Sequence, residues 1–211
     1  MAALKAPIEK QRKQPVQARS TATVGAILEA CIQVLLRVGK EKLTTTLVAQ
    51  RAGVSVGTLY QYFPNKRSLL KAVLRAHLTR VTEAFEAACT AHRGLPLCDM
   101  IAGAACAFFD AKMIEPRVAL ALYSVSSDVD GLGITEDLRV RNESAFEGLL
   151  LSAPEKLDVD MRLAAFTMQS TMIGISRRIL ESKIPAREHG AMREQMIAML
   201  CAYAESVTVR R

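Results

Sequence analysis

The chain has 211 residues, of which 50% are apolar and 5% aromatic, with 28 Lys and Arg against 21 Asp and Glu. Ala, Leu and Met dominate over β-branched runs, which is typical of an all-helical protein, and the length suffices for a small domain beside a larger one. The sequence contains no G-x-S-x-G motif, glycine-rich nucleotide loop, metal-ligand spacing or internal repeat, so it predicts no enzyme, cofactor or metal site.

Positive charge is concentrated at the N-terminal end. Residues 1–75 contain 13 Lys and Arg against three Glu, a net charge of +10, whereas the other 136 residues carry 15 basic and 18 acidic groups, a net charge of −3. A basic module beside a mildly acidic remainder indicates a polyanionic partner for the first part only. Solvated surface lysines are the alternative interpretation.

The cysteines and the apolar runs indicate in which cellular compartment the protein works. Five cysteines form no C-x-x-C pair and leave one unmatched in any disulfide scheme, which favours a reducing environment. The first residues lack the apolar core of a signal peptide, and the longest uncharged apolar run, Met100–Phe109, is half a bilayer span. We therefore expect a cytoplasmic protein with no membrane partner. Cys98 and Cys106 lie too far apart along one helix to bridge each other, so a redox role would need another partner.

The first 19 residues predict a disordered basic arm, because they are polar and contain two prolines. Such an arm can lie in a DNA minor groove or add non-specific affinity, and an inert tail is an equal alternative. From Thr21 to Val38 apolar residues recur at helical spacing, which predicts a supporting helix ended by Gly39. Cys31 falls on its inward face.

The stretch from Leu43 to Leu70 predicts a helix, a tight turn and a second helix. Thr44 can cap the first helix, Gly53 can end it, and Ser55 can cap the second. In the second helix, predicted over residues 56–63, Leu59 and Phe63 can face inward together. Two tyrosines and a glycine are then left on an outward face, which is unusual for a helix without a partner.

The string A-G-V-S-V-G-T-L-Y-Q-Y-F-P-N-K, residues 52–66, resembles the DNA-binding domain of the TetR family of bacterial transcriptional repressors. The resemblance covers about Thr21 to Ala76, and the rest of the chain is similar to the family only in length and helical character. It implies an all-α fold of about nine helices, with a helix-turn-helix DNA-binding domain over residues 20–76 and a larger ligand-binding and dimerisation domain over residues 77–211. Leu47 departs from the family, which usually has a polar or charged residue there.

We expect the helix-turn-helix to bind double-stranded operator DNA. Hydroxyls and free amides in the first turn of the first helix can hold a phosphate, and Lys66 after the cap Asn65 favours an anionic partner. Gln61 can pair with adenine, and the Thr58 methyl can contact thymine. The predicted DNA-binding residues are Thr44, Thr45, Thr46, Ser55, Val56, Gly57, Thr58, Tyr60, Gln61, Tyr62 and Lys66.

The remaining sequence predicts helices at about 66–91, 97–113, 116–126, 135–151, 158–182 and 188–207. The last two are apolar over more than one face, and the resemblance implies that they pair with their symmetry mates in a homodimer. A purely intramolecular core is the alternative.

The resemblance also implies that a small molecule enters the larger domain and shifts the fourth helix. A methionine-rich wall would suit an apolar or aromatic effector, and Asp110 could favour a cation. The other function we considered is a helical ligand-binding or protein-interaction module that does not bind DNA, towards which only Leu47 points. The predicted ligand-binding residues are Cys106, Phe109, Asp110, Met113, Tyr123, Met168, Gln169 and Met172.

Overall fold

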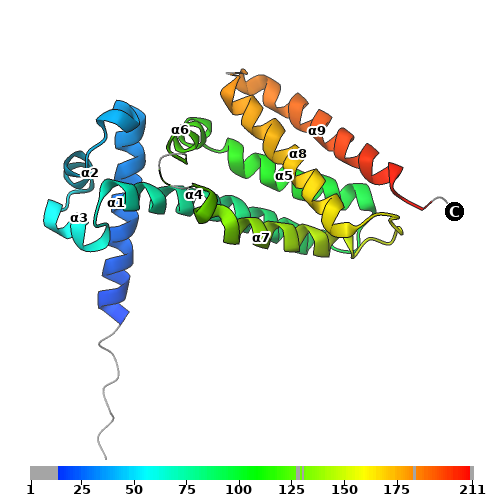
Figure 1. The fold of residues 1–211 in the computed structure, drawn as a ribbon, viewed down its shortest axis with the longest axis horizontal. Helices are drawn as coiled ribbons and strands as arrows, with labels where there is room; N and C mark the ends of the chain where they lie inside the picture. Colours follow the sequence, from blue (N-terminus) through cyan, green and yellow to red (C-terminus); the bar gives the residue numbers. More distant parts are fainter. Residues whose placement is uncertain (1–13, 127–128, 130, 183, 210–211) are drawn as a thin grey trace, which may run out of the picture. The chain divides into compact units, whose positions relative to one another are not determined.

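The structure is a computed structural model that describes residues 14–126, 129, 131–182 and 184–209. These residues contain nine α-helices and one isolated β-bridge, which confirms the all-α prediction (Figure 1). The chain divides into two compact units, Met1–Leu69 and Leu70–Arg211. The helices are α1 Gln14–Lys42, α2 Thr45–Ala52, α3 Val56–Tyr62, α4 Lys66–Ala91, α5 Leu97–Met113, α6 Pro116–Ser126, α7 Gly131–Leu150, α8 Met161–Glu181 and α9 Ala186–Ser206.

Three helices begin earlier than the sequence predicted, among them α9, which starts at Ala186 and not at about residue 188. α1 starts at Gln14, so residues 14–19 are helical and not part of a disordered arm; Pro15 fits there because the first helical turn needs no backbone N–H donor. Residues 1–13 lie outside the described part of the chain. α7 starts at Gly131, whereas the sequence predicted a start at about residue 135.

The core of the first unit comes from the inward face of α1 and from the two short helices. α1 packs against α2, which in turn contacts α3. Gly39 has φ 76° and ψ 169°, so it breaks the regular helix where the sequence predicted an end. The buried residues of this unit include Ile27, Cys31, Val34, Leu35, Leu43, Val48, Ala49, Leu59, Phe63 and Leu69.

One helix in the described ranges, Arg19–Lys42, is long and apolar enough by length and composition to cross a membrane, with a mean hydropathy of 1.5. The same helix supplies Ile27, Cys31 and Val34 to the core of the first unit. Of its most apolar 18-residue window, 28% is buried, so packing accounts for part of this hydropathy.

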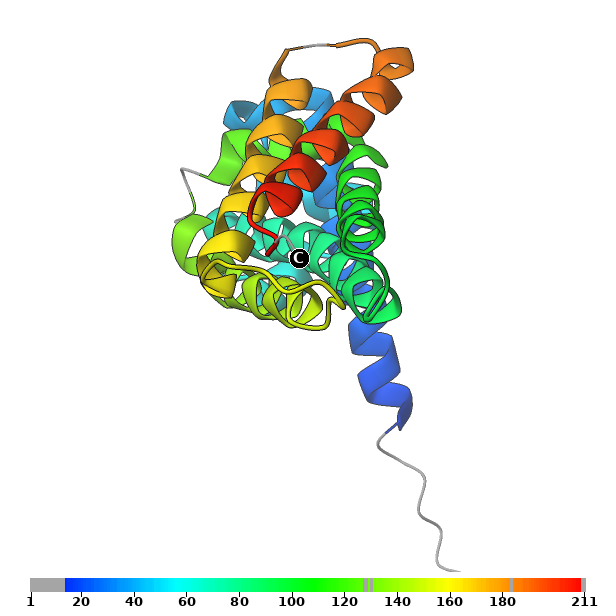
Figure 2. The ribbon, with the colours of Figure 1, turned by 90° about the vertical axis from the view of Figure 1, so that its right-hand side faces the viewer.

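In the second unit α5 packs against α6, α7, α8 and α9, and α7 packs against α8. α8 and α9 lie side by side as an antiparallel pair in both views (Figures 1 and 2). The β-bridge between Leu157 and Thr208 ties the loop after α7 to the segment after α9, and Asp158 N donates to Val207 O over 2.7 Å. Large buried side chains of this core include Phe85, Met100, Ile101, Phe146, Leu149, Met168, Met196 and Leu200.

Candidate nucleic-acid interface

Both helices of the helix-turn-helix are capped by the residues that the sequence indicated. The Thr44 hydroxyl accepts a hydrogen bond from Leu47 N over 3.2 Å, and Gly53 adopts a left-handed conformation with φ 70° after α2. Its N–H closes the helix on the carbonyls of Ala49 and Gln50. α2 therefore has a fixed beginning and a fixed end, although it has only eight residues.

α3 is held in a similar way. The Ser55 hydroxyl accepts from Thr58 N over 2.9 Å and lies 2.8 Å from the Thr58 hydroxyl. Leu59 and Phe63 are buried, as predicted, and anchor the helix to the core. α3 ends at Tyr62, one residue earlier than we expected, because Phe63 is extended with φ −132° and ψ 99°. A helix this short depends on its caps and its anchors.

A hydrogen bond between two side chains joins α2 to α3. Thr45 is buried, and its hydroxyl lies 3.0 Å from the Tyr60 hydroxyl. Thr45 was predicted to contact phosphate, but its burial makes it a support for Tyr60. Of the three threonines, Thr44 caps, Thr45 supports Tyr60, and Thr46 is exposed.

The outer face of α3 is open. Val56 is 36% exposed and Tyr60 45% exposed, and Gly57 and Gln61 are also exposed. A Cβ added at Gly57 would meet nothing closer than the Ser55 hydroxyl at 3.7 Å, so the glycine leaves free space above the helix. Tyr62 and Thr58 are half-buried. This face, with its polar groups and bare backbone, has the features of a surface that reads DNA.

The start of α4 is also capped reciprocally. Ser68 N donates to the Asn65 side chain over 2.8 Å, and Asn65 N donates to the Ser68 hydroxyl over 3.2 Å. The half-buried Lys66, for which we predicted an anionic partner, donates its ammonium to the Lys40 carbonyl over 2.6 Å.

Cys31 lies close to Lys66. Burial raises the pKa of the Cys31 thiol to about 12 despite the nearby Lys66 charge. Cys31 is therefore a packed, unreactive thiol.

Leu47, the departure from the family, is half-buried on α2. It therefore packs in part, which accounts for an apolar side chain at this position. Its placement gives no support to an additional apolar partner.

The structure separates the residues predicted to bind the ligand. Phe109, Met168 and Met172 are buried in the core of the second unit, and Met113 is half-buried against it. Asp110 is exposed and forms an ion pair of 2.8 Å with Arg193 of α9, so it cannot favour a buried cation, and the half-buried Cys106 lies near the same arginine.

Two predicted ligand residues make polar contacts inside the second unit. The Gln169 side chain donates to the Asn142 carbonyl over 2.7 Å, and the Tyr123 hydroxyl accepts from the Lys112 ammonium over 2.6 Å. Sequence reasoning missed Lys112. The signal was available, because Lys112 continues the inward stripe of Ala104 and Phe108 at intervals of four residues.

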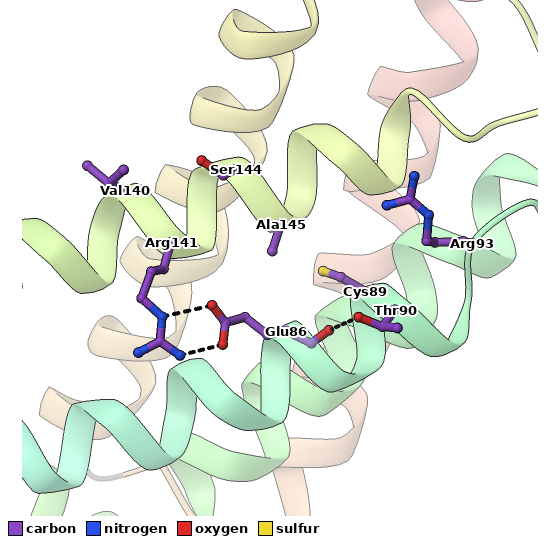
Figure 3. Close-up of a pocket in the computed structure, with 8 residues that line it drawn as sticks. All are labelled: Glu86, Cys89, Thr90, Arg93, Val140, Arg141, Ser144 and Ala145. Carbon is purple, nitrogen blue, oxygen red and sulfur yellow. Dashed lines mark hydrogen bonds and ion pairs between the residues drawn. The ribbon is translucent and has the colours of Figure 1, made fainter.

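A surface pocket of about 460 Å³ lies between α4 and α7 (Figure 3). None of the eight predicted ligand residues lines it. Across its floor Arg141 donates two hydrogen bonds to Glu86, of 2.9 and 2.5 Å, so both charges are matched. Arg93 lines the same space from the turn after α4 (Figure 3). The other lining residues are Cys89, Thr90, Val140, Ser144 and Ala145.

Cys98 has a neighbour that the sequence did not reveal. The Cys201 thiol lies 3.8 Å from the Cys98 carbonyl, so the possible partner of Cys98 is on α9 and not on its own helix. Burial, followed by the contacts with Cys201 and Glu205, raises the pKa of the Cys98 thiol to about 12. A protonated thiol is a poor nucleophile, so rapid oxidation is not favoured.

The first unit has two capped short helices and an open α3 face, and the second unit is a separate helical domain. These features define a helix-turn-helix regulator with a second domain. Residues 27–73 match the family described as bacterial regulatory proteins, tetR family, and residues 96–203 match the tetracyclin repressor-like C-terminal domain. The chain belongs to the TetR family. It is a transcriptional regulator with a helix-turn-helix DNA-binding domain, in a family that is not enzymatic.

Curated relatives align with about a quarter of the chain. The tetracycline repressor protein class C of Escherichia coli is 44% identical over 54 residues, which are 26% of this chain and 25% of that protein. The transcriptional repressor KstR of Mycolicibacterium smegmatis is 42% identical over 55 residues, which are 26% of this chain and 27% of that protein. The chain thus aligns with about a quarter of the length of these relatives.

Solved structures match over nearly the whole chain. A TetR-family regulator from Mesorhizobium loti has a TM-score of 0.74 and 17% identity, covering 90% of this chain and 99% of that chain. The multidrug binding protein EbrR complexed with imidazole has a TM-score of 0.62 and 19% identity, covering 82% and 92%. At these identities the matches establish the fold alone.

Proposed function

We propose that this protein is a cytoplasmic transcriptional repressor that binds a palindromic operator as a homodimer and is released by a small-molecule effector. The observation that carries DNA binding is the open outer face of α3, which is capped at Ser55, anchored through Leu59 and braced through Tyr60. Paired domains of this kind place two recognition helices about 34 to 36 Å apart, in successive major grooves on one face of the DNA.

Within this proposal the residues divide by role. Val56, Gly57 and Gln61 are exposed on α3 and would lie nearest the base edges, with Ser55 and Thr58 at its start. Tyr60, Tyr62 and the exposed Thr46 would contact phosphates and fix the register. Thr44 and Thr45 would act indirectly, through the cap of α2 and through Tyr60.

Lys66 has two possible roles that an experiment separates. It would contact phosphate if its ammonium leaves the Lys40 carbonyl, and it would support the fold if it stays. Loss of a phosphate contact lowers the salt dependence of binding, whereas loss of an internal contact lowers stability without changing that slope.

Genomic fragments that bind the purified protein should be selected first, and their affinity should then be measured over a range of salt concentrations. Tyr62→Phe and Lys66→Ala should each weaken binding, and Lys66→Ala should reduce the salt slope by about one if Lys66 meets a phosphate. Lys156→Ala, which removes an exposed lysine of the second unit, is the matched control. Failure to recover any fragment would favour the alternative of a ligand-binding or interaction module.

The homodimer and the effector complete the proposal. Large apolar side chains on α8 and α9 are exposed, among them Leu163, Phe166, Ile173 and Met199, and a second copy would cover them. The names of the tetracycline repressor and of the multidrug binding protein EbrR refer to small molecules. In the dimer, the distance between the two DNA-binding domains can fit the operator or not. An effector would release DNA if it binds more tightly to the dimer whose spacing does not fit.

A further inference from the structure

Two buried basic side chains of the second unit can carry a charge within the described ranges, Lys112 and His77. Lys112 is the one that is charged at neutral pH. It is 6% exposed and lies in the last turn of α5. Its ammonium is 4.9 Å from the centre of the Phe108 ring and 5.4 Å from that of Tyr123. No carboxylate of the described chain lies within ion-pair distance of it. Buried ammonium groups are normally paired, so this arrangement requires an explanation.

The hydrogen bonds around Lys112 leave donors in excess. One ammonium proton goes to the Tyr123 oxygen over 2.6 Å, which leaves two without an acceptor among the described residues. Because Tyr123 accepts that bond, its own hydroxyl proton is free to be donated elsewhere. Burial raises the pKa of the Tyr123 phenol, so this proton is present at neutral pH. A buried ammonium with more donors than acceptors around it favours an anion.

Charged groups on the surrounding helices do not neutralise Lys112. On α4, Arg80 faces Glu115 at 3.6 Å, and on α8, Arg177 is bonded to Glu181 over 2.7 Å. These acids are therefore committed to arginines. Arg177 also lies over the Tyr123 ring, 5.7 Å from its centre.

His77 of α4 adds no charge to this region. Burial, together with Arg80 and Lys112, lowers the pKa of His77 to about 4, so the ring is neutral at pH 7. The excess positive charge at this place is thus the Lys112 ammonium alone, whose own pKa is lowered to about 8 by burial and by Arg177.

We infer that Lys112 and Tyr123 recognise the anionic end of the effector, and that the effector is a small monocarboxylate with an apolar or aromatic body. This inference rests on the proposed function for the role of the ligand as an effector, but the site itself does not depend on DNA. A single ammonium and a phenol match one carboxylate, whereas a phosphate dianion would require more positive charge. The Phe108 and Tyr123 rings beside the ammonium make its surroundings apolar, which favours an apolar or aromatic body.

The inference reverses the cation preference expected from the sequence. Asp110 is exposed and paired with Arg193, so the charge inside the domain is positive, not negative. The alternative is a lysine of purely structural function, satisfied by one hydroxyl and two rings. The two interpretations differ in whether removal of the ammonium abolishes binding of an anion.

The test is calorimetric titration of the DNA-free, full-length protein at pH 7. The ligands are benzoate, phenylacetate and hexanoate, each compared with its neutral amide. At least one carboxylate should bind saturably with one site per chain, and its amide should bind about tenfold more weakly or worse, because the charge-assisted hydrogen bonds are lost. The affinity should fall as pH rises above about 8, where the Lys112 ammonium loses its proton.

Two variants and a control decide the assignment. Lys112→Met keeps the length of the apolar stem and should weaken carboxylate binding about tenfold or more, whereas Lys156→Met removes an exposed lysine and should leave binding unchanged. Tyr123→Phe keeps the ring and should also weaken binding. Circular dichroism melts show whether each variant is folded, and a folded Tyr123→Phe provides the answer should Lys112→Met not fold.

The inference is overturned if no carboxylate of the panel saturates, if the amides bind equally well, or if the folded variants keep wild-type affinity. Saturable binding that depends on Lys112 supports the site whether or not operator DNA has been found. Carboxylate binding that leaves operator affinity unchanged would instead overturn the effector role, while a missing operator would overturn only the DNA-binding proposal.

Discussion

The hydroxyl oxygens of Thr45 and Tyr60 lie 3.0 Å apart and join the buried first turn of α2 to the exposed face of α3. Thr45 is 9% exposed, so its position is set by the core, whereas Tyr60 is 45% exposed. The hydrogen bond to the fixed Thr45 hydroxyl therefore restricts the motion of the exposed Tyr60 side chain. An ordered phenol on a short helix loses less conformational entropy when it meets a phosphate.

This relationship predicts that Thr45→Val weakens DNA binding although Thr45 does not reach the surface. Thr45→Val and Tyr60→Phe should each reduce operator affinity several-fold, from the loss of a hydrogen bond of about 1 kcal/mol. The double variant should be little worse than Tyr60→Phe alone, because Tyr60→Phe already removes the bond that Thr45→Val breaks. Fluorescence anisotropy with labelled operator measures all three.

The contrary result is additivity. If the effects of the two substitutions add, Tyr60 contacts DNA without the help of Thr45, and the bond between them is incidental. Thr90→Val is the control, since Thr90 is exposed near the end of α4, outside the helix-turn-helix, and has no part in this hydrogen bond.

The caps of the helix-turn-helix provide a second prediction, on stability. Ser55→Ala should destabilise the protein by about 1 kcal/mol, because it removes the hydroxyl that accepts from Thr58 N at the start of a seven-residue helix. Gly53→Ala should also destabilise, because alanine is strained at φ 70°, although its Cβ would meet no atom within 4 Å. Chemical denaturation followed by circular dichroism measures both.

Gly25→Ala is the matched control for Gly53→Ala. Gly25 lies inside α1, also has open space around an added Cβ, and lacks a positive φ. This change should stabilise the helix by up to about 1 kcal/mol. Equal effects at both glycines would show that backbone conformation at Gly53 is not what ends α2.

The sequence was most informative where local chemistry determines structure. Thr44, Ser55 and Asn65 cap the helices assigned to them, and Leu59 and Phe63 are buried as a pair, because these relationships involve residues three or four positions apart. Such signals do not depend on knowing the tertiary fold.

The partners of polar side chains were less predictable, because they come from distant segments. Asp110 pairs with Arg193, and Lys66 donates to the Lys40 carbonyl, contacts that neither spacing nor composition indicates. The predicted ligand residues were chosen by type, but only packing shows that Phe109 is core. Lys112 was missed because lysine is usually exposed, although its spacing placed it inward.

His77 predicts a specific dependence of stability on pH. Its pKa is about 4 in the folded chain and about 6.5 when unfolded, so between these values the unfolded chain binds more protons. The free energy of unfolding should therefore decrease as pH falls from 6.5 to 4, by up to about 3 kcal/mol from this group. His77→Gln should lose this part of the pH dependence.

The measurement is the free energy of unfolding at a series of pH values for wild type, His77→Gln and the control His189→Gln. His189 lies near the turn between α8 and α9 and contacts the Ile184 carbonyl at 3.1 Å. The control should follow the wild-type curve. Identical curves for wild type and His77→Gln would mean that the ring is protonated without cost in the folded protein.

The apolar face of α8 predicts the assembly state. Leu163, Phe166 and Ile173 recur at helical spacing and are all exposed, Phe166 by 53%, so they form one stripe on the outside of the second unit. Phe166→Arg should convert the proposed dimer to a monomer, because a charge would be buried without a partner. The exposed Ile114, at 75%, lies outside both α8 and α9, and Ile114→Arg should leave the dimer intact. Sedimentation velocity distinguishes the monomer from the dimer. The monomeric variant should also lose affinity for a palindromic operator. Its circular dichroism spectrum should remain that of the wild type. A wild-type protein that sediments as a monomer at concentrations that saturate DNA would contradict the twofold arrangement itself.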